Sequence, residues 1–199
     1  MRKLPRPFYT HRTLTVAKDI LGKIFVRKMG KKILSGRIVE VEAYLHHDPA
    51  CHAFRGMTER NKVMFNEGGY LYVYFTYGMH FCANIVTYKE GIGEAVLIRA
   101  VEPIEGIEEM MKNRFQDDCH LKGDGHLYTL TNGPAKFAQA FCLRREHSGI
   151  DLLGKEIYLL DTKPVPKSQI VSTTRIGIRV GTEKEWRFYI KGNEWVSKK

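Results

Sequence analysis

The sequence predicts an α+β domain, built on a mixed, largely antiparallel curved β-sheet with flanking helices and a protruding β-hairpin. Segments rich in β-branched and aromatic residues are frequent, and two pairs of them surround short glycine-containing turns. Strands and helices do not alternate regularly, as they would in a doubly wound parallel sheet. No repeat or Gly/Ser linker interrupts the chain, so we expect one domain over residues 1–199.

The first half of the chain contains most of the predicted strands. Leu14, Ala17 and Leu21 recur at helical spacing and predict a short helix. Strand patterns follow around two turns, the first at Gly30 and the second at Tyr77-Gly78. The expected strands cover residues 23–28, 32–45, 70–76, 79–88 and 94–101.

The second half mixes helices with short strands. An apolar stripe predicts a helix over residues 104–114, and Asn132-Gly133-Pro134 indicates the start of another helix that runs to Phe141. The polar residues 117–131 predict a surface loop. Short strands are expected at residues 157–160, 175–180 and 187–190.

Composition favours a soluble protein that binds a polyanion. The 199 residues carry 32 Lys and Arg against 22 Asp and Glu, a formal net charge of +10, which indicates nucleic acid as a partner. A basic surface that serves only solubility is the alternative. No apolar run is long enough to span a bilayer and the N-terminus lacks a signal-peptide pattern, so we expect a cytoplasmic location without membrane contact.

The cysteines do not predict a metal site or a disulfide framework. Cys51, Cys82, Cys119 and Cys142 are widely spaced, without a Cys-x-x-Cys pair. We expect reduced thiols and no cofactor.

Three patterns carry candidate chemistry. On a strand, Glu40, Glu42 and Tyr44 share one face, either as a functional cluster or as the wet side of an amphipathic strand. The aromatic hairpin places Tyr77 at its tip, where exposed aromatic surface indicates insertion into a partner, although cross-strand packing is the alternative for its tyrosines. Arg99, alone in an apolar strand, requires an anionic partner such as a glutamate or a phosphate.

Several ordered blocks resemble the alkyladenine, or 3-methyladenine (N-methylpurine), DNA glycosylase family, and the chain looks like a bacterial member. The resemblance runs from about Phe8 almost to the C-terminus. It rests on Arg37-Ile-Val-Glu-Val-Glu-Ala-Tyr44, His52-Ala-Phe-Arg-Gly56, Thr58-Glu-Arg-Asn61, Leu71 through Asn84, Val96-Leu-Ile-Arg-Ala-Val-Glu-Pro103, Leu130 through Lys136, Thr174-Arg-Ile-Gly-Ile178 and Arg187 through Val196.

The resemblance implies a monofunctional glycosylase that flips a damaged purine out of double-stranded DNA and hydrolyses its N-glycosidic bond. Glu42 would be the general base, with Arg99 positioning the water and the carboxylate. Tyr44, His52 and Tyr74 would contact the flipped base, and Asn84 would clash with the exocyclic amine of guanine. Tyr77 would fill the gap in the duplex from the minor groove. The expected enzyme is a monomer that uses no cofactor and acts at the bacterial nucleoid.

One geometric prediction follows from these roles. In an antiparallel hairpin, the numbers of two directly opposed residues always add up to the same sum. Tyr74 and Asn84 can face one pocket only if that sum is even. A two-residue turn pairs Thr76 with Met79 and gives an odd sum. We therefore expect an odd-length loop or a bulge near residues 77–79.

Some positions depart from the family pattern, namely Cys51, Glu59 and the His46-His47 pair, and they bear on which lesions are accepted. Three other functions are consistent with parts of the sequence. A metal-dependent nuclease would use Glu40, Glu42, Asp48 and His52. A carbohydrate glycosidase would use the two glutamates, and a non-catalytic nucleic-acid module would not require Glu42.

Overall fold

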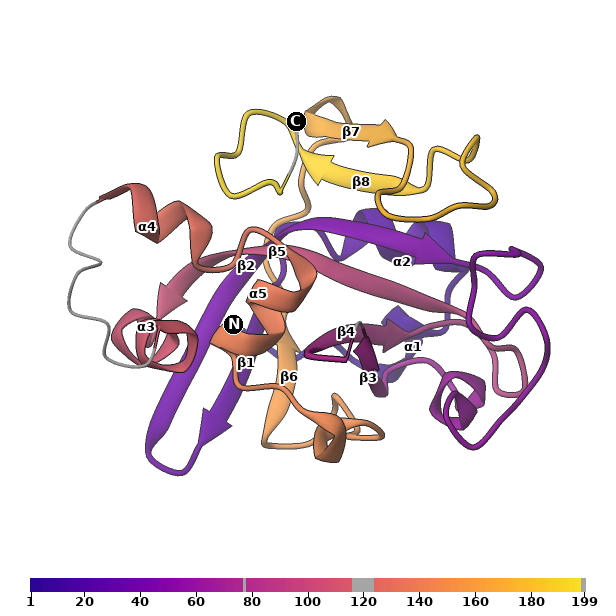
Figure 1. Cartoon of the computed structure of the whole chain (residues 1–199), viewed down its shortest axis with the longest axis horizontal. Coiled ribbons are helices and arrows are strands. Elements are labelled where there is room, and N and C mark those ends of the chain that lie inside the picture. Colours follow the sequence, from indigo (N-terminus) through magenta and orange to yellow (C-terminus); the bar gives the residue numbers. More distant parts are fainter. Residues whose placement is uncertain (77, 116–123, 198–199) are drawn as a thin grey trace.

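The computed structural model describes residues 1–76, 78–115 and 124–197. One antiparallel sheet forms the centre of the molecule and curls across it (Figure 1). Its strands are β1 (Ile24–Met29), β2 (Lys32–Tyr44), β3 (Leu71–Thr76), β4 (His80–Val86), β5 (Ala95–Glu105), β6 (Ile157–Leu160), β7 (Ile170–Thr173) and β8 (Arg187–Ile190). The described helices are α1 (Arg6–Tyr9), α2 (Thr13–Asp19), α3 (Ile107–Phe115), α4 (Asp124–Thr129) and α5 (Pro134–Ala140), with short 3-10 turns at Lys62–Phe65, Arg145–His147 and Lys167–Gln169.

Strand β2 is the spine of the sheet. Along one edge it pairs with β5, from Ser35 to Tyr44, and its other edge is divided between β1 and β8. The strands follow the order β3-β4-β5-β2-β1-β6, and the β7–β8 hairpin joins at the far half of β2. Irregularities in the β2–β5 register on both sides of Glu40 bend the strand there.

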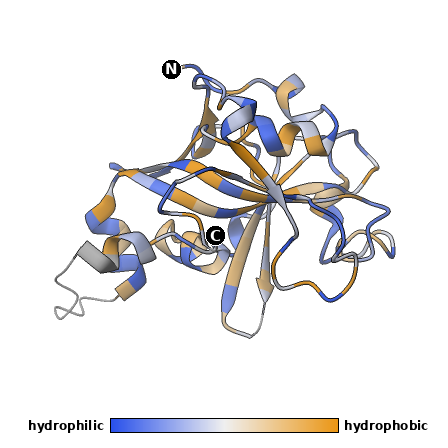
Figure 2. Cartoon of the chain, turned by 90° about the horizontal axis from the view of Figure 1, so that it is seen from above, coloured by the Kyte–Doolittle hydropathy of each residue, from blue (hydrophilic) through white to orange (hydrophobic). Residues whose placement is uncertain are grey.

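Helices cover the sheet and enclose the core. Helix α5 packs on β4 and β5, and α2 packs on β2 and β5 (Figure 1). Hydrophobic and hydrophilic residues alternate along several strands, as Figure 2 shows. A continuous apolar core includes Phe25, Ile38, Ile98, Phe137 and Phe141. Because β2 is covered on both sides, even its carboxylates are buried.

Gly36 allows β2 and β5 to approach closely. A Cβ at this position would lie 2.3 Å from Val101 Cγ1 and 2.9 Å from the Glu102 carbonyl oxygen. Any larger side chain would separate the two strands along which the buried carboxylates lie.

The structure confirms most of the expected elements and corrects several. Every pair of strands within the described residues is antiparallel, so the sheet is not mixed. The residues expected as a strand at 175–180 form an irregular loop, and the strand lies just before it, as β7. Helix α3 begins at Ile107 because β5 continues to Glu105 and Gly106 adopts a left-handed φ of 78°. The loop expected over 117–131 contains α4, although residues 117–123 lie outside the described range.

No helix within the described ranges combines the length and hydropathy that a bilayer crossing requires. Of the four cysteines, Cys51, Cys82 and Cys142 are free thiols, and Cys119 lies outside the described residues.

Candidate active site

A cavity of about 350 Å³ opens between the β3–β4 hairpin, strands β2 and β5, and the loop that follows β7. The resemblance assigns roles to seven residues, and six of them line this cavity, namely Glu42, Tyr44, His52, Tyr74, Asn84 and Arg99. The seventh, Tyr77, lies outside the described residues.

Glu42 is a fully buried carboxylate in the wall of this cavity. Its Oε1 accepts a hydrogen bond of 2.8 Å from the backbone N–H of Ile176 and lies 3.1 Å from Arg99 Nη1. Its Oε2 accepts a hydrogen bond of 2.8 Å from the Tyr44 hydroxyl. These contacts stabilise the charged carboxylate and fix its orientation. The interpretation of Glu42 as the wet face of a strand is therefore wrong.

Arg99 joins the two glutamates of β2. Its Nε donates to Glu40 Oε1 at 2.9 Å while Nη1 pairs with Glu42. Burial alone would lower the pKa of Arg99, but the carboxylates of Glu42 and Glu40 raise it above its ordinary value. The anionic partner expected for this arginine is thus a pair of glutamates.

Glu40 does not line the cavity, and apart from Arg99 its carboxylate has different partners from that of Glu42. Arg187 Nη1 donates to Glu40 Oε1 at 2.9 Å, and the backbone N–H of Ser197 donates to Oε2 at 2.7 Å. Glu40 is as buried as Glu42 but does not line the cavity. It anchors Arg99, β8 and the C-terminal segment.

Aromatic rings form one wall of the cavity. Tyr72 and Tyr74 stack with ring centroids 5.6 Å apart, and the His52 ring meets Tyr74 edge-on at 4.5 Å. A hydrogen bond of 3.1 Å joins His52 Nδ1 and the Tyr72 hydroxyl. Asn61 holds the loop that carries His52, because its Nδ2 donates to the His52 carbonyl at 2.8 Å.

Burial keeps these rings uncharged. It lowers the pKa of His52, with a further decrease from the positive charge of Arg60. It also raises the pKa of Tyr72 to about 12, and raises the pKa values of Tyr44 and Tyr74. At neutral pH the wall therefore consists of a neutral imidazole and neutral phenols.

The hairpin register agrees with the geometric prediction. Thr76 pairs with His80, which leaves a three-residue loop, and Tyr72 pairs with Asn84. Tyr74 and Asn84 therefore face the same side and both line the cavity. The Asn84 side chain is held there by donating from Nδ2 to the Tyr72 carbonyl at 3.2 Å.

The loop after β7 supplies contacts that the residue patterns missed. Arg175 is buried against Asp48, and its Nη1 also donates to the Ala43 carbonyl at 3.1 Å. Its guanidinium lies 4.8 Å from the centre of the Tyr44 ring. This anchor directs the next N–H, that of Ile176, at Glu42. The sequence predicts this segment as a strand, and Thr174 through Ile178 belong to a block that resembles the family, but no role is assigned to it. Tyr72 likewise belongs to the aromatic hairpin and to a matching block without a role of its own.

The four candidate ligands of the nuclease hypothesis do not form a metal site. Glu40 and Glu42 are paired with Arg99, and Asp48 is paired with Arg175 and, at 3.4 Å, with Lys184. Within the described residues, the one His/Cys/Asp/Glu group with metal-ligand spacing is His46, His47 and Glu94.

A buried, arginine-bound carboxylate beside a neutral aromatic cavity, in a strongly basic α+β domain, is typical of an enzyme that acts on a nucleic-acid base. Comparison with known proteins gives the family. Residues 7–194 match the family model described as methylpurine-DNA glycosylase.

Relatives match over nearly their whole length. Proteins described as "Putative 3-methyladenine DNA glycosylase" from Carboxydothermus hydrogenoformans and Clostridium novyi are 49% and 47% identical, over 98% and 100% of this chain and 99% and 100% of theirs. One from Francisella tularensis subsp. tularensis is 47% identical over 94% of this chain and 95% of its own. The chain belongs to the methylpurine-DNA glycosylase family. It is a DNA glycosylase, a hydrolase in the repair of alkylated purines.

Proposed function

We propose that this enzyme excises 3-methyladenine and other alkylated or deaminated purines from double-stranded DNA, as a monofunctional and monomeric glycosylase that starts base excision repair. The names of the relatives support the substrate. The observation that carries the mechanism is the Glu42 carboxylate, buried at the cavity and held by Tyr44, Arg99 and the Ile176 N–H.

Glu42 acts as the general base. A water beside it attacks the sugar C1′ of the flipped nucleotide and gives a proton to the carboxylate. The C1′–O bond forms as the C1′–N9 bond breaks, and the bonding electrons leave with the purine. Such proton transfer accelerates reactions by about 10²–10⁴-fold. Arg99 holds the carboxylate in place for the attack.

The pocket favours a cationic base. Alkylation at N3 or N7 places a positive charge on the purine and weakens its glycosidic bond. An electron-rich ring attracts such a cation by about 0.5–2 kcal/mol per contact. Tyr44, Tyr74 and His52 supply these rings, and a neutral His52 does not repel the charge. Asn84 rejects normal guanine through a clash with its exocyclic amine.

The β3–β4 hairpin enters the minor groove, and Tyr77 occupies the space that the flipped nucleotide leaves. Met79, next to the tip, has 70% of its surface exposed, and the net charge of +10 attracts the DNA backbone. Apolar wedges of this kind are typical of proteins that bend DNA from the minor groove.

A single-lesion duplex tests the function. The enzyme is incubated in EDTA with duplex DNA that carries one 3-methyladenine or hypoxanthine, and abasic sites are then cleaved by alkali. We expect strand cleavage only after alkali and no borohydride-trapped adduct. Cleavage before alkali, or inactivity in EDTA, would contradict the monofunctional, metal-free mechanism.

The glutamates supply a matched pair of variants for the mechanism. Glu42→Gln should abolish excision while lesion binding stays within about tenfold, because removing the base raises the barrier without emptying the pocket. Glu40→Gln should retain more activity. If Glu42→Gln excised the lesion at the wild-type single-turnover rate, Glu42 would not be the general base. If the wild-type protein bound the lesion without excising it, a non-catalytic module would be favoured.

A further inference from the structure

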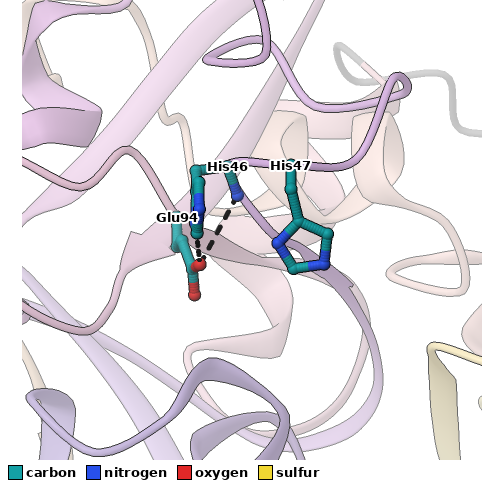
Figure 3. Close-up of side chains that lie close together, drawn as sticks. All are labelled: His46, His47 and Glu94. Carbon is teal, nitrogen blue, oxygen red and sulfur yellow. Dashed lines mark hydrogen bonds and ion pairs between the residues drawn. The ribbon is translucent and has the colours of Figure 1, made fainter.

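A second cluster of functional side chains lies outside the cavity, at the turn that follows β2. His46 and His47 occupy this turn, and Glu94 directly precedes β5 (Figure 3). One ligand atom from each of the three residues lies within 4.8 Å of the others. None of the three lines the cavity.

Glu94 is the unusual member of the cluster because its carboxylate is buried. Its side chain is only 5% exposed, and the one ion pair it makes within the described residues is with His46, whose Nδ1 lies 2.7 Å from Oε1. Its Oε2 accepts a hydrogen bond from the Thr13 hydroxyl, which lies 2.8 Å from the hydroxyl of Thr87. A buried carboxylate requires a positive partner. Here the partner group is an imidazole that is charged only when protonated.

The two histidines can reach the same point as Glu94 Oε1. The His46 and His47 rings are 4.9 Å apart, and both residues are exposed, so their side chains have room to rotate. Zinc bonds of about 2.0–2.2 Å place tetrahedral ligand atoms roughly 3.4 Å apart. His46 Nδ1 and Glu94 Oε1 lie 2.7 Å apart, closer than this spacing, and all three ligand atoms lie within 4.8 Å of one another. Rotation of the exposed histidine side chains can therefore bring the three ligand atoms to the zinc spacing.

We propose that His46, His47 and Glu94 bind a zinc ion, with water in the fourth position. Two imidazoles and a carboxylate suit zinc, whereas magnesium prefers ligand sets made of oxygen. Thr13 orients the carboxylate from the side opposite the ion, as outer-shell groups commonly do. Each imidazole coordinates through a ring nitrogen that carries no proton, so zinc binding releases any proton that this nitrogen holds.

The ion stabilises the fold and takes no part in excision. It links the turn after β2 to the start of β5, and through Glu94 and Thr13 to α2. A ligand that binds only the folded state raises its stability in proportion to the logarithm of its concentration. Zinc should therefore raise the Tm.

Isothermal titration with ZnCl₂ on the full chain tests the site. We expect one-to-one binding by the wild type and weaker binding by His46→Ala and by His47→Ala. Loss of outer-shell groups alone costs about 10–100-fold in metal affinity, so loss of a direct ligand should cost at least about tenfold. His11→Ala, which removes another exposed histidine, is the matched control and should bind like the wild type.

Thermal unfolding supplies an independent readout. At one zinc concentration, zinc should raise the Tm of the wild type and of His11→Ala, and should raise the Tm of His47→Ala much less. MgCl₂ should affect none of them. His47→Ala is used because His47 is exposed, so its replacement leaves the fold intact. Replacement of the buried Glu94 could disturb the fold itself. The proposal is overturned if the wild type shows no one-to-one binding tighter than about 0.1 mM. It is also overturned if His46→Ala and His47→Ala bind zinc as the wild type does.

Discussion

Glu40 and Glu42 lie two residues apart on one strand and are equally buried, yet their different contacts give them different roles. Glu42 faces the cavity, and Glu40 faces two arginines and the C-terminal segment. At the residue scale, the partner atoms therefore distinguish the proposed base from a structural carboxylate. Arg99 couples the two, because it contacts both.

The first prediction concerns Glu40. Glu40→Gln should lower the free energy of unfolding by about 3–5 kcal/mol, because it removes the charge that compensates buried arginines. Urea denaturation measures this loss. Glu59→Gln is the control and should cost no more than about 1 kcal/mol, because the Glu59 side chain is 93% exposed and forms a surface ion pair with Lys62. Equal effects of the two variants would show that the buried pair is energetically unimportant.

The second prediction concerns the pH dependence of the Asp48–Arg175 pair. Although burial opposes ionisation, the hydrogen bond and charge of Arg175 keep the pKa of Asp48 below its ordinary value. Between the two pKa values the unfolded chain binds more protons than the native one. The stability that Asp48 supplies is therefore fully present above its unfolded pKa of about 3.9, and it is lost as the pH falls through the lower folded value.

Asp48→Asn supplies the comparison for this pair. Near pH 7 the variant should be less stable than the wild type by roughly 3–5 kcal/mol. Urea unfolding at a series of pH values should give a constant difference above about pH 5 and a smaller one below about pH 4. A difference that grows on acidification would have the wrong sign for this mechanism.

At the scale of elements, two irregular segments complete a cavity that begins on regular strands. The loop after β7 presents the Ile176 N–H to Glu42, and the three-residue loop of the β3–β4 hairpin sets the register that brings Tyr74 and Asn84 together. Both loops depend on residues with unusual backbone angles. Gly177 and Gly78 have φ values of 80° and 69°.

The third prediction uses two glycines with similar backbones. Gly177 and Gly30 both have left-handed φ angles, and a Cβ at either position would meet nothing within 4 Å. Alanine at either position should therefore lower the free energy of unfolding by a similar amount, about 1–2 kcal/mol. Only Gly177→Ala should lower the single-turnover excision rate, because only that loop contacts Glu42. Equal excision rates for the two variants would show that the loop after β7 does not contribute to catalysis.

The fourth prediction concerns the hairpin tip. Tyr77→Ala should weaken binding to a lesion duplex by about 1–3 kcal/mol, the loss of one base-stacking ring, with an unchanged Tm. Tyr77→Phe keeps the ring and should bind like the wild type. Fluorescence anisotropy with labelled duplex measures both. Normal binding by Tyr77→Ala would exclude intercalation by this residue.

At the scale of the whole molecule, the long strand β2 connects the sheet, the cavity and the C-terminus. It pairs with β1, β5 and β8, and it carries both buried glutamates and Tyr44. Because three strands pair with β2 and helices α2 and α3 pack against it, charged groups on it must be compensated inside the fold. Arg99 of β5 pairs with both glutamates, and Arg187 of β8 pairs with Glu40.

The sequence by itself determined the class of fold, most of the strands, the family and six of the residues that line the cavity. These features follow from local patterns, namely the alternation of residues along strands, the glycines of turns and the ordered motif blocks. Such patterns depend on neighbouring residues and not on how the chain packs. From the roles that the resemblance gives Tyr74 and Asn84, the sequence also predicted an odd-length hairpin loop or a bulge, because side-chain alternation limits which registers are possible.

Only the tertiary structure decided which groups meet across long separations. It paired Arg99 with two carboxylates, Arg175 with Asp48, and His46 with Glu94. It also replaced the strand expected at 175–180 with a loop, because those residues pack against Tyr44 and Glu42 instead of extending a ladder. Such contacts join residues 48–134 positions apart, and their geometry depends on how the whole chain packs.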